Sequence, residues 1–478
     1  MREGLAPFRY YLVIKADAEV QSWYHAPNRE NLAQLANWIA AEAGYGQGKA
    51  LPFEIPAGPL PSDQMHSADA ASRERRDIET LVVPLIIPAE AIATAEFEHF
   101  AEQVGRNDKA FLGGGADITI AGTDHWSPTD AADPMFGNRA AANRLLGLDH
   151  LQTQSGARGR HVNVVVVDQG LDQNRLGSNY GGGWTVGSIN PGTTQHQPGT
   201  LRRPHGMMIA HNILKVAPEV TLWDLPLVPL TSSNIPTKIS DIPAFLGHAQ
   251  VAFHDMLDAI ADYKSSGARP GPWILVNPWA IFDTKSDLPS STGHDYINNP
   301  NHIFNRLIAD VVNGGIDVVF GAGNCGQFCP DQRCGGNDRG PGHSIFGANS
   351  LPEVLTVGAV RTDGLWLGYS SQGPGQSKLA RKKPDLCAPS QFCETDDGFI
   401  VNTGTSAACA LATGVVAALR SEWYAVSPAQ RPPLSPRELK QLLIRTARKP
   451  QGPNWNNRLG YGILNAAAAY DELASTIP

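Results

Sequence analysis

The sequence predicts an α/β fold, a parallel sheet flanked by helices on both faces, with a small N-terminal α+β domain. Two observations support this prediction. Apolar runs rich in β-branched residues recur from about residue 160 onward, and helical patterns separate them. Continuous apolar strands joined by helices are typical of a parallel sheet that is covered on both faces. The first hundred residues carry strand and helix patterns of their own.

The N-terminal domain is expected to span residues 1–110. Its pattern predicts a strand over 9–16, a helix over 29–44, a strand over 79–88 and a helix over 89–105. Residues 111–145 shift to Gly, Asp, Pro and Thr, a composition that favours a connecting segment. Residues 146–478 then form the main domain.

The main domain contains five apolar runs that we expect to be strands. They are "HVNVVVVD" (161–168), "VTLWDLPLV" (220–228), "WILVNPWA" (273–280), "IDVVFGAG" (316–323) and "EVLTVGAV" (353–360). Helical patterns over 248–267 and 300–315 lie between them. In open parallel sheets, the loops at the carboxyl ends of the strands carry the chemistry.

Composition excludes several classes of function. The 478 residues include 38 Lys and Arg against 46 Asp and Glu, a net charge of −8, so the chain as a whole does not attract nucleic acid or anionic membranes. The longest apolar stretch contains two prolines and a glutamate, which argues against a membrane span. The first 30 residues lack the apolar core of a signal peptide, so we expect a cytoplasmic protein.

Four polar residues occupy positions that a core does not explain. Asp168 ends a strand of four valines, His205 begins an apolar helical pattern, Asn324 follows the strand "IDVVF", and Ser406 begins an alanine-rich helix. Each has an ordinary structural explanation when taken alone, as a helix cap, a turn residue or a satisfied core histidine.

Together, the four residues match the needs of acyl transfer. A serine hydroxyl becomes a nucleophile when an imidazole accepts its proton, and a carboxylate orients that imidazole. The oxyanion that forms needs fixed donors, such as a side-chain amide and a backbone N–H at a helix N-terminus. The chain order Asp, His, Ser is that of subtilisin, and differs from the orders of chymotrypsin and of α/β-hydrolases.

From about residue 158 to 473 the chain resembles the subtilisin-like serine peptidases, the subtilase family. Seven stretches match the family's landmarks in order: "VVVVDQGLD", "HGMMIA", "KVAPEVTLW", "GAGNCG", "YSSQGPG", "KPDLCAPS" and "GYGILNAAAA". The resemblance implies a serine endopeptidase (a hydrolase acting in proteolysis) that cleaves protein or peptide substrates through an acyl-enzyme. It also implies that Ser406 attacks, His205 acts as general base and acid, Asp168 orients His205, and Asn324 donates to the oxyanion.

The family resemblance also suggests how substrate binds. Strands beside the family's cleft pair with the substrate backbone, and "LVNPWA" is one counterpart here. Pro278 and Trp279 replace the small residues usual at this edge, and a proline cannot donate a backbone hydrogen bond. Substrate preference is therefore not predicted.

Two other functions fit parts of the sequence. A catalytically inactive subtilisin-like scaffold or binding module would keep the fold, although here all four catalytic positions are filled. "GAGNCG" satisfies the dinucleotide-binding pattern G-x-G-x-x-G, but a Pro- and Gly-rich loop follows it where that site needs a helix. The N-terminal domain corresponds to the family's propeptide or to a retained accessory domain.

Three of the six cysteines, Cys325, Cys329 and Cys334, lie close together, with His343 beyond them. Their spacing, with His343, loosely resembles a metal-ligand set, but it is not the paired C-x-x-C pattern of a zinc site. Free thiols or one local disulfide are the alternatives, and a disulfide beside Asn324 would connect redox state to the oxyanion loop. We expect no cofactor. Calcium is common in the family, but no loop here can be assigned to it. The oligomeric state is not predicted.

Overall fold

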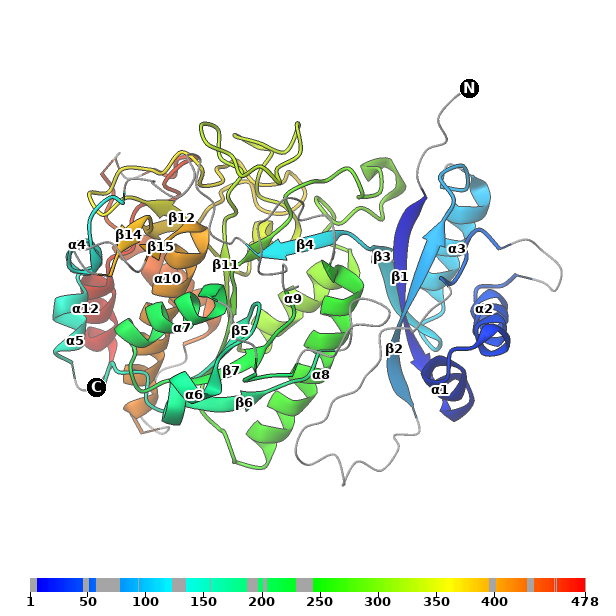
Figure 1. Cartoon of the computed structure of the whole chain (residues 1–478), viewed down its shortest axis with the longest axis horizontal. Coiled ribbons are helices and arrows are strands. Elements are labelled where there is room, and N and C mark those ends of the chain that lie inside the picture. The colour runs from blue at the N-terminus through cyan, green and yellow to red at the C-terminus, as the bar shows by residue number, and fades with distance from the viewer. Residues whose placement is uncertain are drawn as a thin grey trace.

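The computed structural model describes residues 7–45, 51–56, 78–92, 94–122, 135–154, 156–186, 197–200, 204–228, 244–394, 401–427, 434–450, 452 and 454–477. The N-terminal domain lies at one end of the molecule, beside the larger domain that holds the long helices (Figure 1). In the part described, no helix is long and apolar enough to cross a bilayer.

A seven-stranded parallel sheet forms the centre of the main domain, in the order β13-β12-β11-β9-β5-β7-β6. The strands are β5 (Asn163–Val167), β6 (Tyr180–Gly183), β7 (Thr221–Leu225), β9 (Trp273–Asn277), β11 (Asp317–Gly321), β12 (Leu355–Val360) and β13 (Leu386–Pro389). All five strands predicted from apolar runs belong to this sheet, so the predicted α/β class is confirmed.

Helices cover both faces of the sheet because its strands are apolar on both sides. In β5, Val164 and Val166 pack into one core with helices α7 (Pro204–Val216) and α10 (Gly404–Ala425). Val165 and Val167 point the other way, into a second core with α8 (Leu246–Ser265) and α9 (Ile303–Asn313). The remaining helices of this domain are α4 (Arg139–Leu146), α5 (Leu148–Gln152), α6 (Gln173–Leu176), α11 (Pro436–Thr446) and α12 (Ala466–Thr476).

The N-terminal domain is an antiparallel sheet in the order β2-β1-β3, with a third core between that sheet and its helices. Its elements are β1 (Phe8–Ala16), α1 (Ala18–His25), α2 (Arg29–Glu42), β2 (Glu79–Ile87), α3 (Ala95–Arg106) and β3 (Phe111–Ala116). Both predicted strands are present. The predicted helix over 89–105 begins only at Ala95, because Thr94 caps it by accepting from the N–H of Phe97.

The N-terminal sheet packs against helices α8 and α9 of the main domain, away from α7 and α10 (Figure 1). Arg9 on β1 forms an ion pair of 3.2 Å with the buried Asp117, which also accepts from the N–H of Gly247 on α8. The Tyr11 hydroxyl donates to Gln250 of the same helix at 3.3 Å. These contacts fix the N-terminal domain to the helices that cover one face of the main sheet.

After β3 the chain crosses to the main domain as a short strand, β4 (Thr119–Gly122). This strand is the centre of a separate three-stranded sheet, between β10 (Trp279–Ala280) and β8 (Ala244–Phe245), and it is antiparallel to both. Both β3 and β4 fall in the range 111–145, where the composition favoured a connection.

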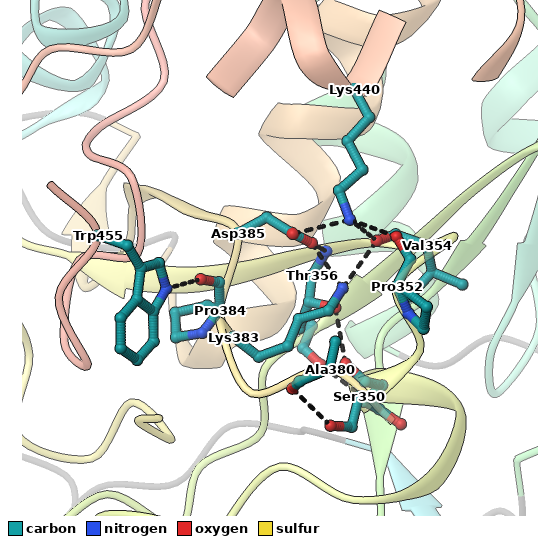
Figure 2. A network of polar contacts seen from close by, with 12 residues as sticks. Ser350, Pro352, Val354, Thr356, Ala380, Lys383, Pro384, Asp385, Lys440 and Trp455 are labelled. Atoms are coloured by element: carbon teal, nitrogen blue, oxygen red, sulfur yellow. Dashed lines mark hydrogen bonds and ion pairs between the residues drawn. The ribbon is translucent and has the colours of Figure 1, made fainter. Parts of the chain in front are cut away.

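A buried network of charges joins α11 to the edge of the main sheet (Figure 2). Asp385 lies between two lysines, with Lys383 Nζ 2.7 Å from one carboxylate oxygen and Lys440 Nζ 2.8 Å from the other. Both ammonium groups also donate to the carbonyl of Val354, at 2.8 Å. Burial lowers the pKa of Lys383 to about 7, although the negative charge of Asp385 opposes that shift.

Candidate active site

Four polar residues predicted from the sequence gather around the carboxyl ends of the central strands. Asp168 directly follows β5 and Asn324 lies three residues beyond β11, whereas His205 and Ser406 lie in the first turns of α7 and α10. All four are buried, with exposures of 0% for Asp168, 7% for His205, 1% for Asn324 and 0% for Ser406. Charged and polar groups this deep require specific partners.

Asp168 and His205 are in direct contact. His205 Nδ1 lies 2.8 Å from Asp168 Oδ1, which also accepts from the N–H of Gln169 at 2.7 Å. Because a carboxylate only accepts hydrogen bonds, the contact places the proton of a neutral imidazole on Nδ1 and its basic lone pair on Nε2.

Close backbone packing holds the histidine against the aspartate loop. The residue after His205 is Gly206, and a Cβ at this position would lie 2.2 Å from the carbonyl oxygen of Gly170. Only glycine permits that approach. The close approach of α7 to the loop that follows β5 therefore requires a glycine at position 206, directly after His205.

Ser406 lies at the N-terminus of a long buried helix. Gly404, with a φ of +68°, starts α10, and its carbonyl accepts from the hydroxyl of Ser390 at 2.7 Å. Helix α10 packs directly against α7, which carries His205. The first N–H groups of a helix and the positive end of its dipole favour negative charge at this place.

The side chain of Asn324 is held by the residue that precedes Ser406. Its Oδ1 accepts from the backbone N–H of Thr405 at 3.0 Å and from the Thr405 hydroxyl at 3.2 Å. The Thr405 hydroxyl in turn accepts from the N–H of Gly323 at 3.1 Å. With its oxygen fixed in this way, the amide of Asn324 has a set orientation, and its NH₂ group supplies the remaining donors.

A disulfide closes the loop that follows Asn324. It joins Cys325 to Cys334, while Cys329 is a free thiol. Of the alternatives considered for these cysteines, a local disulfide is the one present. The N–H of Asp331 within the loop donates to the backbone carbonyl of Asn324 at 2.9 Å. Among the described residues, no group of three or more acidic, His or Cys side chains is placed to hold a metal ion.

A buried carboxyl group behind the site was not predicted from the sequence. Asp224 Oδ2 accepts from the N–H groups of Leu171 at 3.0 Å and Gly199 at 2.8 Å, which joins the loop after Asp168 to a segment preceding α7. Burial raises the pKa of Asp224 to about 7, against the effect of those two hydrogen bonds, and the nearby charge of Asp168 adds to the rise. Its position in the apolar run "VTLWDLPLV" was the only available signal.

A second set of polar contacts supports α7 from the other side. Glu394, in the segment before α10, accepts from Asn402 at 2.7 Å and pairs with Arg139 and with His211 of α7. Arg139 also donates to Asn212 of α7 at 2.7 Å. Although burial opposes ionisation, hydrogen bonds from His211 and Arg139 hold the pKa of Glu394 well below its usual range.

The edge predicted to pair with substrate already pairs with another part of the chain. Trp279 and Ala280 of β10 lie opposite Gly122 and Ala121 of β4. On the other side of β4, Thr119 and Ile120 pair with β8. The strand that occupies this edge, β4, therefore comes from the stretch of chain directly after β3 of the N-terminal domain.

A parallel sheet covered by helices on both faces, with Asp168 and His205 in contact at its carboxyl edge, is the arrangement of the subtilisin-like class. A model of the subtilase family matches residues 159–462, which is well over half of the chain. This chain belongs to the subtilase family.

Known proteins are similar to this chain over different shares of its length, and the chain spans less than two thirds of Mycosin-1 and of fervidolysin. Mycosin-1 of Mycobacterium tuberculosis is 29% identical over 168 residues, which are 32% of this chain and 36% of Mycosin-1. Fervidolysin from Fervidobacterium pennivorans, described as a keratinolytic enzyme related to subtilisin, has 13% identity and a TM-score of 0.51, over 98% of this chain and 62% of that protein. MycP1 from Mycobacterium smegmatis has 20% identity and a TM-score of 0.42, over 74% of this chain and 88% of that protein.

Proposed function

We propose that this chain is a serine endopeptidase that hydrolyses protein or peptide substrates through an acyl-enzyme on Ser406. The contact of 2.8 Å between Asp168 and His205, on the helix that packs against the helix of Ser406, carries this proposal. Buried Asp and His side chains arranged in this way, beside a serine at a helix N-terminus, match the needs of acyl transfer. The match to the subtilase family supports the same class of reaction.

In the proposed reaction, His205 Nε2 takes the proton of the Ser406 hydroxyl while Ser406 Oγ attacks the carbonyl carbon of the scissile peptide bond. The resulting oxyanion accepts from the Asn324 amide and from backbone N–H at the start of α10. His205 then gives its proton to the leaving amine, and the C–N bond breaks. Water, deprotonated by the same imidazole, attacks the acyl carbon. The bond to Ser406 Oγ then breaks, His205 returns its proton to that oxygen, and the acid is released. Asp168 stabilises the imidazolium in both halves.

We propose further that the N-terminal domain inhibits the enzyme in cis, with residues 119–122 in the place of a bound substrate strand. An extended peptide gains most of its affinity on a sheet edge from main-chain hydrogen bonds. Strand β4 is bonded on both sides, to β10 and to β8. A peptide substrate would compete with it for the same edges.

The activity is tested by incubating the purified chain with an unfolded protein and following new N-termini by mass spectrometry. We expect cleavage by the wild-type chain and none by Ser406→Ala. A folded wild-type chain that cleaves nothing, even after β4 is weakened as described below, would favour the inactive scaffold instead.

The inhibition is tested at Ile120, a β4 residue that is 1% exposed. We predict that Ile120→Asp raises activity about tenfold or more, because a buried carboxylate weakens the docking of β4. Ile78→Asp is the matched control, since Ile78 is 62% exposed, and it should change nothing. Equal activity of wild type and Ile120→Asp, in chains with the same melting temperature, would contradict inhibition by this segment.

A further inference from the structure

We infer that Arg333 is a substrate-binding residue, which donates a hydrogen bond to the backbone carbonyl of an extended peptide at the position that Gly122 occupies. This inference rests on the proposed function, because it takes β4 as the intramolecular counterpart of a substrate strand. It adds a residue that lies outside the Asp, His, Ser and Asn set.

The contact that carries the inference joins a side chain to a backbone atom. Arg333 Nη1 donates to the carbonyl oxygen of Gly122 at 2.8 Å. Gly122 is the last residue of β4 and lies opposite Trp279 of β10. Because every peptide carries a carbonyl at this place, the same contact is available to a substrate of any sequence.

The guanidinium is held in place by partners other than β4. Nε and Nη2 of Arg333 donate to the two carboxylate oxygens of Asp331, at 3.0 and 2.7 Å. The guanidinium also lies 4.0 Å from the centre of the Phe282 ring. The two paired side chains are only 10% and 2% exposed. A planar, paired and stacked guanidinium presents Nη1 in a fixed direction, so little freedom is lost when a carbonyl binds it.

The loop that carries Arg333 is the loop that positions Asn324. The disulfide joins Cys325, which follows Asn324, to Cys334, which follows Arg333. The N–H of Asp331 donates to the Asn324 carbonyl at 2.9 Å, and Asp331 accepts in turn from the N–H of Cys334 at 3.0 Å. Because the loop is bonded to Asn324, a peptide that Arg333 binds is held at a fixed distance from the proposed oxyanion donor.

The surface beside this carbonyl is apolar and belongs to the same unit. Ala280 and Phe282, from the β10 edge, form a small buried cluster with the two cysteines of the disulfide. Ala121 of β4 packs against that cluster. The loop and the β10 edge therefore pack together as one unit. A peptide bound there can pair with the backbone of β10 and accept a hydrogen bond from Arg333.

The test is a double-mutant cycle between the arginine and the carbonyl, measured by calorimetry on chains that carry Ser406→Ala. One probe is a synthetic peptide of residues 117–122 with a C-terminal amide, which keeps the Gly122 carbonyl. The other has the same sequence to Ala121 but ends in an N-ethylamide, which lacks that carbonyl. Competition from the chain's own β4 affects both peptides equally, so the ratio of their dissociation constants isolates the contact.

With Arg333 present, the carbonyl peptide should bind about tenfold more tightly or better, equivalent to about 1.4 kcal/mol at 25 °C. Arg333→Gln should reduce that ratio to near one, and Arg333→Lys should restore part of it. Arg333→Gln leaves Asp331 buried without its charge partner, which could disturb the loop. The double variant Arg333→Gln, Asp331→Asn removes the whole pair, and its ratio should also be near one.

Arg339→Gln is the matched control, because Arg339 lies in the same region and donates to the carbonyl of Cys334 at 2.8 Å. It should keep the wild-type ratio. The inference is overturned if Arg333→Gln keeps that ratio, if Arg339→Gln loses it equally, or if the carbonyl peptide binds no chain. Failure of the proposed function is a separate result, seen as absence of cleavage by chains with an intact Ser406.

Discussion

Asn324 is held by the amide oxygen, the atom that takes no part in the proposed reaction. The N–H and the hydroxyl of Thr405 both donate to this oxygen. The NH₂ group is thereby oriented before substrate arrives, which is how fixed donors stabilise a developing charge without reorganisation. Thr405 therefore connects the proposed nucleophile, Ser406, to the proposed oxyanion donor, Asn324.

We predict that Asn324→Ala lowers turnover by about 100- to 1,000-fold, because the variant loses a donor that acts mainly in the transition state. The Michaelis constant should change little. Steady-state hydrolysis of a fluorogenic peptide measures both quantities. Fluorescence-monitored unfolding of the same sample shows whether the loop is intact. A variant that is folded and keeps full turnover would remove Asn324 from the mechanism.

The site residues were predictable where three features pointed to the same reaction: the residue type, its position after a strand or at a helix start, and the chain order Asp, His, Ser. Asp168, His205, Asn324 and Ser406 could be selected because each departs from the apolar pattern around it. Asp224 could not be selected, because its role depends on two backbone N–H groups, of Leu171 and Gly199, that only the folded chain brings to it. Glu394 was missed for the same reason.

The long apolar strands of the main sheet were predictable from the sequence, whereas most of the short strands were not. Five apolar runs in the main domain predicted strands of the parallel sheet, since length and β-branched composition separate them from helices. Strands β4 and β8 are four and two residues long and carry no periodicity, whereas β10 lies within the predicted run 273–280. Their pairing is set by distant segments, so the occupied edge at Trp279 was not predicted.

The buried charges in Figure 2 show how one element is fixed to another. Asp385 compensates two ammonium groups, and Lys383 is fully buried. The network joins α11, through Lys440, to the strand edge at Asp385 and Val354. Removal of Asp385 leaves both ammonium groups uncompensated, whereas removal of one lysine leaves the carboxylate paired with the other.

We predict that Asp385→Asn lowers the free energy of unfolding by about 3–5 kcal/mol, because it leaves two buried ammonium groups without a counter-charge. Lys383→Met should be much milder, since Asp385 keeps Lys440 as its partner. Urea unfolding measures both variants. The control is Arg106→Gln, which removes an exposed i,i+4 pair with Glu102 and should change stability by less than about 0.5 kcal/mol. Equal effects of Asp385→Asn and Arg106→Gln would contradict this account.

The contact between the two domains is lined by two histidines, the buried His302 and the half-buried His248. His302 Nε2 donates to the carbonyl of Ala116 at 3.0 Å, and its ring lies edge-on to Tyr11 of β1. Burial lowers the pKa of His302 to about 4, against that hydrogen bond, and lowers the pKa of His248 on α8 to about 4. Arg9 adds to the effect at His248, whereas burial raises the pKa of the neighbouring Asp117.

These histidines predict a dependence of stability on pH. A histidine with a pKa of about 4 when folded and about 6.5 when unfolded binds fewer protons in the native state between those values. Its contribution is therefore complete above about pH 6.5 and is lost as the pH falls towards about 4. The carboxyl groups with raised pKa contribute in the opposite direction, so we consider only the difference between wild type and a variant.

We predict that the stability of the wild type, relative to His302→Gln, decreases steadily from pH 6.5 to pH 4, because glutamine does not titrate. Urea midpoints at a series of pH values measure that difference. His25→Gln, at a half-exposed position paired with Glu79 outside this contact, is the control. A difference between wild type and His302→Gln that stays constant with pH would contradict the buried, neutral state of His302.

The compartment expected from the sequence stays a prediction, and one feature of the molecule argues against it. Disulfides persist in oxidising compartments and are reduced in the cytosol of most organisms. The bond between Cys325 and Cys334 closes the loop that carries Arg333 beside Asn324. A cytosolic location would leave the loop beside the proposed oxyanion donor without this constraint.

Every step of the proposed reaction depends on Ser406 being a nucleophile that His205 activates. Fluorophosphonate labelling of the purified chain, with the adduct located by mass spectrometry, measures that activation. We predict an adduct on Ser406 that disappears in Ser406→Ala and is nearly absent in His205→Ala, with Ile120→Asp as a background in which the docking of β4 is weakened. No adduct on Ser406 in a folded chain of that background, or one that forms equally fast without His205, would contradict it.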